Sequence, residues 1–194
     1  KKENTRKPFI PVWKIQTTAT WIFYSFRLAR KARFNGPQVE YVAQYIDDER
    51  EAARLHCLRR MRILDTAAEK SFDSITDSVS RHFNVPIALI SLVDEKRQWF
   101  KSRVGLDVCE TEREHSFCAH AIELPDVMIV EDARLDPRFA DNPLVTGAPH
   151  IRFYAGAVIK VPPYDIPIGT LCIIDNKPRT MSHKEQLELL RMCR

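Results

Sequence analysis

The chain has 194 residues and a mass of 22.6 kDa, enough for one ordinary domain with an extension. Its formal net charge of +4 is unevenly distributed. Residues 1–36 contain nine basic residues and one acidic residue, a net charge of +8, whereas the rest contain 21 basic and 25 acidic residues, a net charge of −4. A basic arm on a mildly acidic body predicts an attachment segment outside the folded domain.

The cysteine pattern argues against a secreted disulfide scaffold and against a zinc finger, because it has no Cys-x-x-Cys pair and an odd total. No apolar run approaches the roughly 18 residues of a membrane span, and no signal peptide is visible. We therefore expect a reducing, intracellular location, cytoplasmic unless a targeting segment directed the chain to an organelle interior. The five cysteines are Cys57, Cys109, Cys118, Cys172 and Cys193.

The basic arm, residues 1–46, contains a predicted helix. Apolar residues from Val12 to Ala29 recur at spacings of three and four, and Asn35-Gly36-Pro37 ends the pattern. Because several aromatic residues lie off this stripe, the helix needs a partner. Three interpretations stay open: packing on its own domain, docking into a larger assembly, or lying on an anionic membrane surface. Nucleic acid is not expected, since no reader motif accompanies the basic residues.

Two further helices are predicted before the first strand. The first opens at Asp47 and runs to about Leu64 along an apolar seam. For the second, Thr66 and Glu69 have the spacing of a capping box. Apolar residues then follow at helical spacing until Asn84 and Pro86 end the helix.

The apolar period then changes to that of strands. Residues 87–93 are nearly all apolar, as in a strand buried on both faces, and residues 98–104 form a second strand of the same hairpin. Phe100 and Val104 are expected on one face of that strand. A short helix over residues 116–122 and a strand over residues 127–130 follow.

The last part of the chain predicts a long loop, a second hairpin and a helix. The loop covers residues 131–150, a length typical of a functional segment. Strands follow over residues 151–161 and 166–175, with Gly169 at an expected close approach. Ser182 and Glu185 form another capping box before the final helix. This order of elements predicts an α+β sheet covered by helices.

Several motifs, in this order, resemble those of the GAF domain, and in particular of GAF domains that precede bacterial histidine kinases and diguanylate cyclases. The resemblance implies a central antiparallel sheet of five to six strands with helices on both faces, over residues 47–194. The motifs are Arg62-Ile63-Leu64-Asp65-Thr66, Phe72-Asp73, Val85-Pro86-Ile87-Ala88, Gln98-Trp99-Phe100-Lys101-Ser102, residues 116–122, Asp136-Pro137-Arg138-Phe139, Ile151-Arg152-Phe153-Tyr154-Ala155-Gly156 and Ile168-Gly169-Thr170-Leu171-Cys172.

The resemblance also implies a small-molecule pocket beneath the short helix and the long loop. Each lining residue has a structural alternative: His120 as a hydrogen-bonded structural histidine, Asp132 and Arg152 as partners of each other or of loop backbone, and the phenylalanines as ordinary core. The predicted lining residues are Phe117, Cys118, His120, Asp132, Phe139, Arg152, Phe153 and Tyr154.

Three chemical functions are disfavoured. A metal site at Cys118 and His120 is not expected, because residues two apart on a helix point to opposite sides. Covalent bilin attachment lacks its usual family context. Some GAF domains are free methionine sulfoxide reductases, and Cys109 with Cys118 could be the reacting pair, but residues 131–149 lack the cysteine that this family keeps there.

We therefore expect a non-enzymatic sensory or regulatory module without a cofactor. It would bind a small molecule or a protein partner, or form a dimer through its first and last helices. The alternative is a structural subunit of a larger complex, docked through residues 1–46.

Overall fold

The computed structural model describes residues 37–194, with side chains from residue 44 onward. The helix predicted between Val12 and Ala29 lies outside the described residues. By its contacts the chain divides after Asp47, and Asp48–Arg194 form one compact unit. Among residues 37–194, no helix combines the length and apolar composition needed to cross a lipid bilayer.

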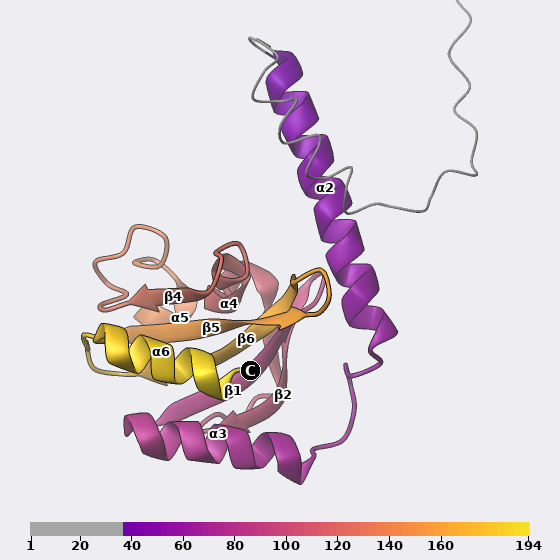
Figure 1. The fold of residues 1–194 in the computed structure, drawn as a ribbon. Coiled ribbons are helices and arrows are strands. Elements are labelled where there is room, and N and C mark those ends of the chain that lie inside the picture. Colours follow the sequence, from indigo (N-terminus) through magenta and orange to yellow (C-terminus); the bar gives the residue numbers. More distant parts are fainter. Residues whose placement is uncertain (1–36) are drawn as a thin grey trace, which may run out of the picture. The chain divides into compact units, whose positions relative to one another are not determined.

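The unit is an antiparallel six-stranded sheet with helices on both faces, which confirms the predicted α+β fold (Figure 1). The strand order is β3-β2-β1-β6-β5-β4. The strands are β1 (Ile87–Val93), β2 (Arg97–Val104), β3 (Glu110–Glu112), β4 (Val127–Val130), β5 (Phe153–Val161) and β6 (Ile166–Asp175).

The helices divide between the two faces of the sheet (Figure 1). The helices α3 (Lys70–Phe83) and α6 (His183–Met192) pack on one face, with Val79 and Leu189 fully buried there. The short helices α4 (Phe117–Ala121) and α5 (Pro143–Thr146) cover the other, with a 3-10 turn, η1 (Arg113–His115), just before α4. A third apolar cluster joins Leu58 of α2 (Pro37–Arg60) to Leu92 and Trp99.

The helix boundaries correct two predictions. Helix α2 begins at Pro37, ten residues before the predicted start, since proline fits the first position of a helix. The capping box at Thr66 is wrong: α3 begins after Glu69, which makes no side-chain cap. Thr66 Oγ1 instead accepts a hydrogen bond from Lys101 Nζ at 2.7 Å, because this buried ammonium needs acceptors. The capping box of Ser182 and Glu185 is confirmed.

A bulge in the β1–β2 hairpin explains a further error. Ile90 pairs with Ser102 and Ser91 with Phe100, so Lys101 is an extra residue without a partner on β1. Phe100 and Val104 therefore lie on opposite faces of the sheet, not on one face as predicted, because Val104 pairs with Ala88. Strand β3 was not predicted, since its sequence, Glu-Thr-Glu, has no apolar period.

Candidate functional site

Helix α4 lies across the middle of the sheet, as the sequence predicted. Ser116 caps it, with its Oγ accepting a hydrogen bond from Ala119 N at 3.0 Å. Ser116 Oγ also donates to the Gln98 side chain on β2, so the cap is attached to the sheet. The helix buries Phe117, Cys118 and Ala121 against strands β1, β5 and β6.

Beneath α4, two thiols and three hydroxyls form what we call the thiol–hydroxyl cluster. Its members are Cys118, Cys172, Tyr154, Thr170 and Ser91, all almost fully buried. The sulfurs of Cys118 and Cys172 lie 3.8 Å apart. Two hydroxyls donate hydrogen bonds to Cys118 Sγ, from Thr170 at 3.1 Å and from Tyr154 at 3.3 Å. The Cys118 sulfur therefore accepts at the centre of a polar group inside an apolar core.

The strand register brings the sheet members of this cluster together. Ser91 of β1 is paired with Thr170 of β6. Cys172 follows two residues later on β6, so its side chain lies on the same face as that of Thr170. Gly156 leaves room for the Tyr154 ring, because a Cβ at position 156 would lie 2.2 Å from the Tyr154 hydroxyl oxygen. Any other residue at position 156 would displace the phenol.

The thiol–hydroxyl cluster gives its two cysteines different acidities. Burial raises the pKa of Cys118, but hydrogen bonds with Cys172, Thr170 and Tyr154 outweigh it and lower the pKa below the usual thiol value. The pKa of Cys172 is raised by its hydrogen bond with Cys118 and by burial. Cys118 is thus the sulfur that ionises first.

Aromatic rings fill the rest of the space where the pocket was expected. Phe117 and Phe139 stack with ring centroids 3.9 Å apart, and Tyr154 lies 5.2 Å from Phe117. All three side chains are at most 3% exposed. Two hollows, of about 550 and 750 Å³, lie elsewhere, around the end of α2 and the β1–β2 turn. The predicted small-molecule site is therefore closed by its own side chains in this structure.

Of the other predicted lining residues, Phe153 lies on the wrong face. It belongs to the apolar cluster beneath α3 and α6, because successive residues of a strand point to opposite faces and Tyr154 faces α4. His120 is exposed and its ring lies edge-on to Phe139 at 5.0 Å. Although the residue is largely exposed, partial loss of hydration against its neighbours, together with the nearby Arg138, lowers the pKa of His120. Cys118 and His120 thus point to opposite sides, as their spacing predicted.

The two charged residues predicted for the pocket, Asp132 and Arg152, do not pair with each other. Asp132 accepts hydrogen bonds from Arg134, at 3.0 Å from Nε and 2.6 Å from Nη2, and the pKa of Asp132 is lowered by this pair. Arg152 Nη1 donates to the backbone oxygens of Val145 at 2.8 Å and Ile151 at 3.0 Å. Both side chains therefore hold the long loop in shape, the structural alternative that the sequence left open for Arg152.

The sequence prediction missed Ser91, Thr170 and Cys172 as members of the thiol–hydroxyl cluster. The sequence did contain an indication of this cluster, because Ser91 and Thr170 are small polar residues flanked by apolar residues in buried stretches of β1 and β6. Such residues need a polar neighbour. Their pairing partner across the sheet, however, depends on a register that the sequence alone did not fix.

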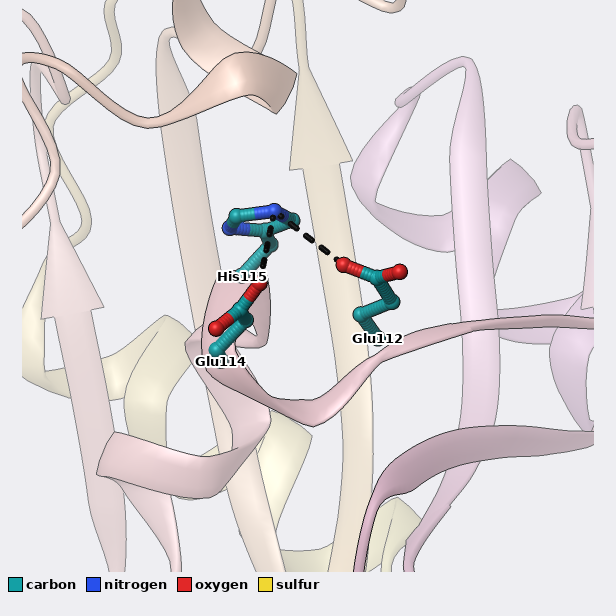
Figure 2. A group of neighbouring side chains, drawn as sticks. All are labelled: Glu112, Glu114 and His115. Atoms are coloured by element: carbon teal, nitrogen blue, oxygen red, sulfur yellow. Dashed lines mark ion pairs between the residues drawn. The ribbon is translucent and has the colours of Figure 1, made fainter.

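A separate group of potential metal ligands lies on β3 and η1 (Figure 2). His115 Nε2 lies 3.4 Å from a Glu112 carboxylate oxygen and 3.5 Å from a Glu114 carboxylate oxygen. The Glu112 and Glu114 side chains are 72% and 71% exposed. The imidazole already pairs with both carboxylates, so we interpret this group as a solvated ion-pair cluster.

With the fold and site defined, comparison with known proteins identifies the family. The GAF domain family matches residues 67–193, which is more than half of the chain. The chain belongs to the GAF family. The family resemblance noted in the sequence motifs is thereby confirmed.

Among curated proteins, this GAF chain is similar to a cyclic di-GMP phosphodiesterase of Pseudomonas aeruginosa, with 45% identity over 131 residues. The match covers 68% of this chain and spans only 22% of the length of that relative.

Solved structures share the fold at low identity. The type II free methionine-R-sulfoxide reductase of Thermoplasma acidophilum has a TM-score of 0.54 and 13% identity, covering 64% of this chain and 86% of that one. The GAF domain of an Acinetobacter phosphoenolpyruvate-protein phosphotransferase has a TM-score of 0.52 and 18% identity, covering 73% and 88%. At this identity the likeness shows the fold alone.

Proposed function

We propose that this GAF domain is a non-catalytic regulatory module of a longer signalling protein, and that changes beneath α4 are passed to α2. The similarity to 22% of a cyclic di-GMP phosphodiesterase supports a signalling context. It assigns no catalytic step to this chain, because the shared family is GAF and most of the relative lies outside the match.

The observation that carries the proposal is the ionic contact between the α4 segment and α2. Arg113 of η1, three residues before the Ser116 cap, donates from Nη1 to a Glu51 carboxylate oxygen at 2.6 Å. Glu51 also accepts two hydrogen bonds of 2.7 Å from Arg54, whose Nη1 donates to Val93 O at 2.6 Å. A shift of α4 would therefore move charges that hold α2, and a terminal helix is a suitable element for a two-state change.

A small-molecule input beneath α4 is the second candidate, and the family resemblance favours it. Binding there requires Phe117 and Phe139 to leave their stacked positions, since both rings fill the space. The alternative of a structural subunit depends on residues 1–46, of which the structure describes only the last ten. Neither alternative is supported by a contact as specific as that of Arg113 with Glu51.

The experiment uses the Pseudomonas relative as a reporter. Residues 48–194 of this chain, which include Glu51, Arg59 and Arg113, replace the segment of that phosphodiesterase to which this chain is similar, and cyclic di-GMP hydrolysis is measured. Because one link in a coupled network is worth about 0.5–2 kcal/mol, Arg113→Gln should change the rate about two- to thirtyfold. The matched control is Arg59→Gln. Arg59 lies on α2 like Glu51 and pairs with Glu95 of the β1–β2 turn, but both side chains are more than half exposed, so the rate should be unchanged.

Two results would count against this proposal. Hydrolysis of cyclic di-GMP by the 194-residue chain alone would contradict a non-catalytic role. Equal rates for the Arg113→Gln and unsubstituted chimeras would show that the Arg113–Glu51 contact transmits nothing.

A further inference from the structure

The two buried cysteines beneath α4 have the geometry of a reactive pair. Cys118 Sγ lies 3.8 Å from Cys172 Sγ, one on the short helix and the other on the central strand β6. The sequence had instead paired Cys118 with Cys109, but Cys109 is exposed whereas Cys172 is buried. The sulfur that faces Cys118 is therefore that of Cys172.

The surrounding hydroxyls favour charge on one sulfur of the pair. Thr170 and Tyr154 donate to Cys118 Sγ at 3.1 and 3.3 Å, and Ser91 Oγ lies nearby without a partner of its own. Neutral donors around a thiolate stabilise it without a fixed counter-charge. An attacking thiolate beside a protonated second thiol is the arrangement that disulfide formation needs.

We propose that Cys118 and Cys172 are a site of reversible oxidation by hydroperoxides, which joins α4 to β6 through a disulfide. The Cys118 thiolate attacks one oxygen of the hydroperoxide, the O–O bond breaks, and the leaving oxygen takes a proton to give an alcohol or water. Cys118 is then a sulfenic acid, and attack by the Cys172 sulfur breaks the S–O bond and releases water. Overall, two thiols lose two electrons and two protons, and one hydroperoxide is reduced.

Access to the pair is controlled by α4. Cys118 and Cys172 are 2% and 0% exposed, so a peroxide reaches them only when the cover opens. The cover is a helix of five residues held by ring packing, and such short elements open without unfolding of the sheet. The oxidation rate should therefore rise with peroxide concentration and then level off at the rate of opening.

The test treats the reduced 194-residue chain with hydrogen peroxide at pH 7, alkylates the remaining thiols in acid and maps the peptides by mass spectrometry. We expect a Cys118–Cys172 peptide pair that is two hydrogens lighter than the two thiol peptides and that dithiothreitol separates. The control Cys109→Ser should leave this product unchanged. A folded protein that oxidises at Cys109 and never forms the Cys118–Cys172 pair would refute the proposal.

Two variants test the roles of the sulfurs. In Cys172→Ala the pair cannot form, and dimedone should trap the sulfenic acid on Cys118. At peroxide concentrations below the plateau, Thr170→Val, which keeps the side-chain shape, should slow disulfide formation about three- to tenfold through loss of one donor to the thiolate. An unchanged rate in Thr170→Val below the plateau, or a dimedone adduct on Cys172 that forms in Cys118→Ala as fast as the Cys118 adduct forms in Cys172→Ala, would contradict the role of Cys118 as the attacking sulfur.

This inference rests on the proposed function only for the consequence of the disulfide. In the chimeric phosphodiesterase, peroxide should change hydrolysis, and Cys118→Ser should abolish that response. A disulfide that forms without a change in hydrolysis would refute the regulatory consequence and leave the chemistry standing. If Arg113→Gln changes hydrolysis but no Cys118–Cys172 disulfide forms, the proposed oxidation is refuted and the proposed regulatory function stands.

Discussion

Two of the regions in which the domain buries polar groups do so by different means. Beneath α4, the thiol–hydroxyl cluster contains only groups that are neutral when protonated. At the end of α2, buried Arg54 is paired with Glu51, and Glu51 in turn with Arg113. A buried neutral group that loses its partner costs about 1–3 kcal/mol, whereas a buried ion that loses its partner costs about 3–5 kcal/mol. The thiol–hydroxyl cluster is therefore suited to rearrangement, and the Arg54–Glu51–Arg113 group is suited to holding α2 on the domain.

The largest expected effect comes from breaking the ionic region. Arg54→Met leaves the Val93 carbonyl without its donor and Glu51 with only Arg113, so the free energy of unfolding should fall by about 3 kcal/mol. Urea denaturation followed by circular dichroism measures this change. The matched control Lys184→Met alters an 87% exposed side chain and should cost less than about 0.5 kcal/mol. Equal losses in the two variants would contradict the comparison.

Acid should weaken the same region. Burial raises the pKa of Glu51, but hydrogen bonds from Arg54 and Arg113 lower it to about 2, from 4.5. Because the folded state has the lower pKa, this stabilisation is complete above pH 4.5 and is lost as pH falls from 4.5 towards 2. We expect about 1–2 kcal/mol, since Glu51 is partly solvated. Glu51→Gln and the unsubstituted protein should differ at pH 7 and converge near pH 2; a constant difference would contradict this assignment.

The smallest expected effect is in the neutral region. Ser91 Oγ is buried without a partner, so Ser91→Ala should stabilise the protein by up to about 1 kcal/mol. The control Ser102→Ala removes a buried hydroxyl that bonds to Thr76 and Asp73 at 2.7 Å, and should cost about 1–2 kcal/mol. Urea denaturation of both variants provides the measurement. A loss in Ser91→Ala as large as that in Ser102→Ala would show that Ser91 is satisfied in solution.

Much of the fold was predictable because local patterns determine it. The mainly apolar runs over residues 87–93, 151–161 and 166–175 predicted three strands of the sheet, and Ser182 with Glu185 predicted the start of α6. The capping box predicted at Thr66 is wrong although its spacing to Glu69 fits the motif. The Thr66 hydroxyl instead accepts a hydrogen bond from Lys101, which lies on a distant strand. A local motif fails where a buried charge needs the same group.

The candidate site was only partly predictable, for a similar reason. Cys118, Phe117, Phe139 and Tyr154 do meet beneath α4. Their predicted role as ligand-lining residues stays a prediction, and the rings fill the space. Asp132 forms its ion pair with Arg134, two residues away, and not with Arg152, because holding a nearby partner costs less conformational entropy of the chain. Spacing gave the location of the site but not which groups pair within it.

Because β6 lies between β1 and β5, the sheet can finish folding during synthesis only after β6 has been made. Strand β1 is made early but receives its second neighbour only when residues 166–175 have left the ribosome, because they form β6. Until then one edge of an almost wholly apolar strand offers unpaired amide and carbonyl groups, the feature by which nascent chains associate wrongly. Premature termination before β6 should therefore yield insoluble product rather than a smaller folded domain.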